Sequence, residues 1–168
     1  ACGALALAPL FYFAMSERLE GGDGGSARSR LPHYEVAFGM IRDHPVLGVG
    51  ANNFAVVLPD HAGPSVSREW LYTVHNRFLL VWAETGTLGL LALLALLGSG
   101  AAYGWRVWLS QDPHFAPFGL AVAVSILAQL PHMAVDMFHA RPEVQLLWVV
   151  IALVLAMSLR LQRREAVR

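Results

Sequence analysis

Long apolar stretches separated by polar segments dominate the hydropathy pattern of the chain. Residues 1–15 are apolar throughout, and further apolar stretches follow at 78–103, 115–137 and 144–159. A helix needs about 20 apolar residues to cross the hydrocarbon core of a bilayer. The last stretch is short, but Arg160 at its end can snorkel to the interface. The pattern predicts an all-α, polytopic membrane protein fragment with three full spans and, at residues 1–15, one truncated span.

Composition excludes several classes of protein. Of the 168 residues, 56% are hydrophobic and 14% are charged, whereas a soluble domain carries about 25% charged residues. An ordinary soluble enzyme is therefore not expected. The 12 basic residues balance the 12 acidic ones, which leaves no electrostatic footprint for nucleic acid. The chain has one cysteine, so it forms no intrachain disulfide.

The distribution of arginines predicts the orientation of the spans. The C-terminal tail holds Arg160, Arg163, Arg164 and Arg168 against one acid, Glu165, and loops rich in basic residues stay in the cytoplasm. Counting back from that end gives a cytoplasmic tail at 161–168, spans at 144–160, 115–138 and 77–103, a periplasmic turn at 139–143, a cytoplasmic loop at 104–114 and a large periplasmic loop at 16–76.

The large periplasmic loop is expected to contain short helices. Apolar residues recur at helical spacing within 31–43, where Pro32 suits a first helical turn. Pro45 then forces the chain out of the helix at His44. Glycines and asparagines between 48 and 53 predict tight turns with positive φ. The alternative is that the helix simply lies on the lipid surface.

Two polar residues, His75 and Asn76, stand where the loop enters the next span. Asn76 or Thr73 is a good helix N-cap, so His75 should lie at or near the helix N-terminus. The positive end of the helix dipole disfavours imidazolium there, and a neutral imidazole can act as a general base. A capping or interfacial histidine is the alternative.

Charged side chains near the bilayer supply further candidates. Glu84 lies nine residues beyond His75, about 13 Å along a helix, and a carboxylate in an apolar span faces the protein interior or water. The alternative is that Glu84 forms a structural pair or a hydrogen bond to a helix neighbour. Among the outward arginines are Arg30 and Arg68, whose guanidinium groups suit a lipid-linked pyrophosphate. They could equally be solvated or pair with nearby acids.

Motifs for other chemistry are missing from the sequence. The outward histidines lack the spacing of a zinc site, and the chain has no P-loop and no glycine-rich dinucleotide fingerprint. We therefore expect neither a metal nor a cofactor.

Two segments together resemble a known family. The first comprises RLPHY at 30–34 and MIRDHPVLGVGANNF at 40–54, and the second comprises HN at 75–76 and AETGTLG at 83–89. Both are similar to the O-antigen ligase and polysaccharide polymerase family, where they open and close a large periplasmic loop. Asp136 and Phe138 also resemble the C-terminal pattern of that family.

The resemblance implies a bacterial inner-membrane enzyme of lipopolysaccharide biosynthesis. Such enzymes transfer a glycan from undecaprenyl pyrophosphate to a hydroxyl of lipid A-core or another acceptor, without a metal ion. It implies that His75 is the general base and that Arg30 holds the pyrophosphate, although Tyr34 stands where the family has tryptophan. Arg68, Asn76 and Glu84 are predicted to bind substrate. A further arginine of the family is missing, so the fragment alone is expected to be inactive.

Two alternatives remain open. The acceptor is not readable from these motifs, so a glycan polymerase or a protein O-oligosaccharyltransferase of the same family is possible. A transporter or non-catalytic membrane scaffold is the alternative from another class. Transporters have broken helices and midplane polar residues, often in inverted repeats. Pro131 and His132 fit that description, but four spans contain no visible repeat.

Overall fold

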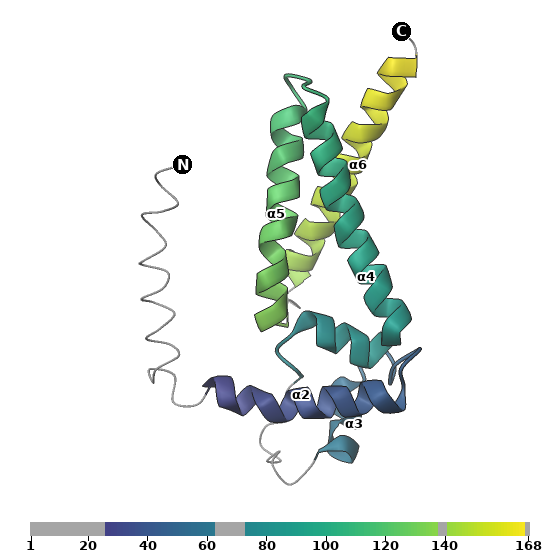
Figure 1. Ribbon diagram of the computed structural model, residues 1–168, viewed down its shortest axis with the longest axis vertical. Helices are drawn as coiled ribbons and strands as arrows, with labels where there is room; N and C mark the ends of the chain where they lie inside the picture. The colour runs from purple at the N-terminus through teal and green to yellow at the C-terminus, as the bar shows by residue number, and fades with distance from the viewer. Residues whose placement is uncertain (1–25, 63–72, 138–140, 167–168) are drawn as a thin grey trace.

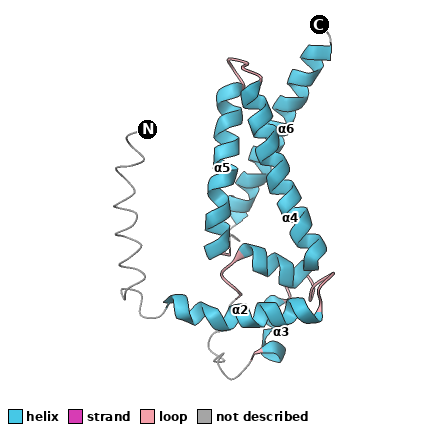
Figure 2. Cartoon of the chain, viewed as in Figure 1, coloured by secondary structure: helices cyan, strands magenta, loops and turns pink. Residues whose placement is uncertain are grey.

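The structure, a computed structural model, describes residues 26–62, 73–137 and 141–166, and within these ranges it contains helices and no strand (Figure 2). The helices are α2 (Ser26–Asp43), α3 (Phe54–His61), α4 (Arg77–Leu109), α5 (Ala116–Val135) and α6 (Arg141–Ala166). The prediction of an all-α fold is confirmed. The truncated span predicted at 1–15 lies outside the described residues.

Three of the described helices are long and apolar enough to cross a membrane. They cover Arg77–Leu109, Ala116–Val135 and Pro142–Arg164, which confirms the prediction of three full spans. Helices α4 and α5 form an antiparallel pair, and α6 crosses behind them (Figure 1). The two helices approach each other closely because Gly104 and Gly119 face each other without side chains. A Cβ on Gly119 would lie 2.7 Å from the carbonyl oxygen of Gly104.

A second layer lies across the foot of this bundle. Helix α2 runs crosswise beneath the spans, with α3 below it (Figure 1). The layer has a hydrophobic core of its own, distinct from the core of the bundle. Its buried members come from α2, α3, the segment before α4 and the start of α4: Val36, Ala37, Met40, Ile41, Phe54, Leu58, Val74, Leu80 and Ala83. We call α2, α3 and this core the outward layer.

The outward layer differs from the sequence prediction in two respects. Helix α2 begins at Ser26 rather than at residue 31, so Pro32 lies inside the helix, where it removes one backbone hydrogen bond. Helix α3 was not predicted. The predicted turns are confirmed, since Gly48, Gly50 and Asn52 all have positive φ.

Helix α4 is interrupted at Gly86, where φ is 67° and ψ is −171°. The part before Gly86 runs across the foot of the bundle beside α2, and the part after it rises through the bundle (Figure 1). Residues 87–109 alone cover about 34 Å, which is enough to cross the hydrocarbon core. The hydropathy pattern predicts Glu84 inside the apolar span, whereas the structure places it in the crosswise part of α4, before the break at Gly86.

Candidate functional site

The candidate general base, His75, lies immediately before the first turn of α4. Asn76 is the N-cap of this helix, and its side-chain oxygen accepts a hydrogen bond from the N–H of Leu79 at 3.0 Å. The prediction of an N-cap at this point is confirmed. The cap fixes the helix start at Arg77 and leaves the half-buried His75 just outside it, at the positive end of the helix dipole.

The segment that carries His75 is held from two sides. On one side, the neighbouring Val74 is fully buried in the core of the outward layer. On the other, the N–H of Arg77 donates to the carbonyl oxygen of Asp136 at 3.1 Å, and Thr73 contacts the sulfur of Met137. The site therefore combines the loop, the start of α4 and the end of α5.

Two titratable residues at the end of α5, His132 and Asp136, were not predicted to lie near the start of α4. The carboxylate of Asp136 lies 3.5 Å from the Nε2 atom of His132, one helical turn earlier, and both side chains are about half exposed. Asp136 appeared in the sequence only as part of the pattern before the last span. Its approach to Arg77 joins residues 59 positions apart, which no local pattern reveals.

At the break in α4, backbone N–H groups of the loop after α2 form hydrogen bonds to the helix. The carbonyl oxygens of Ala83 and Glu84 accept hydrogen bonds from the N–H groups of Val49 and Gly50, at 2.9 and 2.8 Å. In a continuous helix these oxygens would accept from residues 87 and 88. The loop thus replaces the hydrogen bonds that the break removes, as buried backbone groups require.

The side chain of Glu84 extends this junction to α3. Its Oε1 atom accepts a hydrogen bond from the N–H of Phe54, the first residue of α3, at 3.2 Å. The N-cap of α3, Asn53, makes no side-chain cap hydrogen bond and donates instead to the carbonyl oxygen of Val49. Glu84 therefore caps the N-terminus of α3 in place of Asn53. This contact favours a structural role for Glu84.

The side chains of the two candidate arginines, Arg30 and Arg68, lie outside the part of the chain that the structure describes. Arg30 lies in the first half of α2, three residues before the buried His33, and its side chain is outside what the structure describes. Arg68 lies outside the described residues altogether. The structure thus places Asp136 against Arg77 at the start of α4, next to His75 and Asn76 in the chain. It ties Glu84 to α3 and gives no position for either guanidinium group.

Comparison with known proteins identifies the protein family of this chain. A family model described as O-antigen ligase matches residues 1–94, more than half of the chain. The match includes the outward layer, His75 and the break in α4. Comparison with curated proteins gives no match. The family comprises membrane proteins that transfer glycans from lipid-linked donors. By this match, together with its membrane helices, the chain belongs to the O-antigen ligase family.

Proposed function

We propose that this chain carries part of the catalytic site of an O-antigen ligase. The reaction transfers a glycan from undecaprenyl pyrophosphate to a hydroxyl group of lipid A-core or another acceptor. His75 removes the proton from the attacking hydroxyl, and Arg30 holds the pyrophosphate leaving group. The single observation that carries the proposal is the position of His75 directly before the N-cap of α4, in a segment fixed on both sides.

The chemistry needs these two kinds of side chain. A sugar hydroxyl is a weak nucleophile and needs a base within hydrogen-bond reach. A neutral imidazole meets that need, and His75 lies directly before the N-cap of α4. The leaving pyrophosphate gains negative charge as the glycosidic bond breaks, so a guanidinium group stabilises the transition state more than the ground state.

Three further residues are assigned to substrate binding in this proposal. Arg68 adds a second guanidinium group for the pyrophosphate. Asn76 offers its amide nitrogen, since its oxygen is engaged in capping α4. Glu84 contributes its second carboxylate oxygen, because its Oε1 atom binds the N–H of Phe54. No metal ion is assigned a role in this reaction.

The arginines at the end of α6 indicate which side of the membrane the outward layer faces. The end of α6 carries Arg160, Arg163 and Arg164, and such clusters stay on the cytoplasmic side. The outward layer lies at the opposite end of the bundle (Figure 1). We therefore assign the outward layer and His75 to the periplasmic face of the inner membrane, where lipid-linked glycans are consumed.

The test replaces His75 by alanine in the full-length protein. We expect glycan transfer to fall by a factor of about 10²–10⁴, the usual effect of losing a general base, with an unchanged protein level in the membrane. The control variant is His114→Ala, which removes an exposed histidine at the other end of the bundle. Normal transfer by the His75→Ala variant would exclude this histidine as the base.

The stereochemistry of the product gives a second test. A single displacement by the acceptor hydroxyl inverts the configuration at the anomeric carbon. NMR of the isolated product should therefore show inversion relative to the donor. Retention would contradict a single displacement and would require a covalent intermediate that His75 and Arg30 alone do not provide.

A further inference from the structure

A cavity lined by both polar and apolar residues lies at the end of the bundle remote from His75. It has a volume of about 310 Å³ and lies between the last turns of α4 and α6. Four of its lining residues are polar, and leucines flank them: Arg106, Ser110, Ser158 and Gln162, with Leu109 and Leu161. None of these residues belongs to the proposed catalytic site.

The polar lining can donate hydrogen bonds into the cavity. Arg106 forms no ion pair within the described residues, and the hydroxyl of Ser158 makes no hydrogen bond there either, although Ser158 is only 5% exposed. Gln162 adds an amide. A guanidinium group, a hydroxyl and an amide together match the oxygen atoms of a phosphate group.

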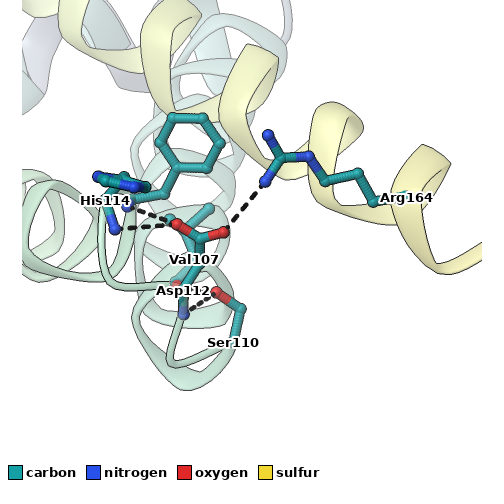
Figure 3. Close-up of polar contacts among 6 residues, drawn as sticks. Val107, Ser110, Asp112, His114 and Arg164 are labelled. Carbon is teal, nitrogen blue, oxygen red and sulfur yellow. Dashed lines mark hydrogen bonds and ion pairs between the residues drawn. The ribbon is translucent and has the colours of Figure 1, made fainter.

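Asp112, the acid that follows α4 in the chain, forms no ion pair with Arg106. Asp112 directs one carboxylate oxygen to the Nη1 atom of Arg164 at 3.2 Å and the other to the N–H groups of His114 and Phe115, at 2.9 and 3.1 Å (Figure 3). The guanidinium group of Arg164 also lies over the ring of Phe115, 5.7 Å from its centre. The positive charge of Arg106 therefore remains available to a ligand.

The position of the cavity relative to the bilayer identifies the class of ligand. Arg106 lies one turn before the end of an apolar helix, next to the packed rings of Trp105 and Trp108, which are typical of the membrane interface. Leu109 and Leu161 flank the polar lining and provide an apolar surface for acyl chains. A free phosphate ion would gain nothing from these leucines.

We propose that this cavity binds the headgroup of an anionic phospholipid. The lipid phosphate contacts Arg106 and Ser158, and the first carbons of the acyl chains contact Leu109 and Leu161. Arg160 and Arg163 form no ion pair with a described side chain, and they add positive potential at the same end of the bundle. Basic pockets between membrane helices bind anionic headgroups in this way.

The test titrates the purified full-length protein, in a neutral detergent, with short-chain phosphatidylglycerol. Native mass spectrometry measures bound lipid, and thermal unfolding measures the stabilisation. We expect Arg106→Gln to weaken binding about tenfold, as the loss of one charge-assisted contact predicts. The matched control is Arg163→Gln, which removes the same charge outside the cavity and should change binding by less than about twofold.

Three outcomes would overturn the proposal. Equal weakening by the two arginine variants would mean general surface charge rather than a site. Equal binding of phosphatidylcholine would mean that the lipid charge is not recognised. Equal stabilisation by inorganic phosphate would mean a free-anion site. If Arg106→Gln fails to fold, Ser158→Ala takes its place, since it removes a cavity donor and keeps every arginine.

Discussion

Thr87 donates two hydrogen bonds to the carbonyl oxygen of Pro45, one from its N–H at 2.9 Å and one from its hydroxyl at 2.8 Å. In a continuous helix the N–H of Thr87 would have bonded to Ala83, whose oxygen is instead taken by Val49. The membrane helix and the loop after α2 therefore exchange hydrogen bonds at the break. Because the crosswise part of α4 begins next to His75, the loop helps to fix the position of the candidate base.

The first prediction concerns Gly86. Its φ of 67° with ψ of −171° is a conformation that residues with a Cβ rarely adopt, and a Cβ there would overlap the carbonyl group of Val46. We expect Gly86→Ala to destabilise the protein by about 1–3 kcal/mol from backbone strain alone. Glycan transfer should fall with it, because the crosswise part of α4 must shift. Thermal unfolding and a transfer assay on the full-length protein measure the two effects.

Gly98 provides the control for this prediction. It lies in the same helix, and a Cβ on it would meet no atom within 4 Å. Gly98→Ala should leave both stability and transfer unchanged or slightly improve stability, since alanine favours helices by about 1 kcal/mol over glycine. If the two variants behave alike, the break is not rigid and the hydrogen-bond exchange does not fix His75.

The second prediction separates the two roles of Glu84. Alanine at this position leaves the N–H of Phe54 without its acceptor, at an expected cost of about 1–3 kcal/mol. Glutamine keeps an acceptor oxygen and removes the charge, so Glu84→Gln should retain most of the stability. If Glu84 also binds substrate through its charge, the Glu84→Gln variant will be stable but slow. Unfolding midpoints and the KM and kcat values of both variants distinguish these cases.

Much of this architecture is readable from local sequence patterns. Apolar length alone predicts the three spans, because each must cover the hydrocarbon core. The cap at Asn76 and the positive φ at Gly48 are also predictable, since each depends on the chemistry of one residue. Local patterns give the site its outline, namely the histidine and its place at a helix start.

The remaining features depend on contacts between distant segments. Helix α3 has eight residues, too few to form without burial of Phe54 and Leu58. Gly86 resembles a small residue at a helix contact, and its positive φ arises only where the loop carbonyl of Val46 approaches. The meeting of Asp136 with Arg77 depends on how α5 packs against α4. Such long-range pairings leave no periodic signal in the sequence.

The third prediction concerns the cap of α4. Asn76→Ala removes the acceptor for the N–H of Leu79 and should cost about 1 kcal/mol. Asn76→Asp keeps that acceptor and should preserve the unfolding midpoint. If the amide nitrogen of Asn76 binds substrate, the Asn76→Asp variant will fold normally and transfer slowly. Normal transfer by Asn76→Asp would limit this residue to capping and withdraw it from the substrate site.

The fourth prediction uses acid to test the junction at the other end of the bundle. The hydrogen bond from the N–H of His114 lowers the pKa of Asp112 below its ordinary value of 3.8, with further contributions from Phe115 and Arg164. A carboxyl group whose pKa is lowered by folding adds stability above its unfolded pKa and loses it as the pH falls through the folded pKa. The stabilising effect of Asp112 should therefore persist at neutral pH and disappear only below about pH 4.

Two variants decide whether this assignment is correct. Asp112→Asn keeps an oxygen for the N–H of His114 but cannot be ionised, so its unfolding midpoint should be lower than that of the wild type at neutral pH and should approach it in acid. Arg164→Gln keeps the carboxylate and its backbone donors. Because the N–H of His114 is the largest cause of the shift, Arg164→Gln should retain most of the acid dependence. If it instead removes that dependence as fully as Asp112→Asn does, the ion pair with α6 dominates and the backbone does not.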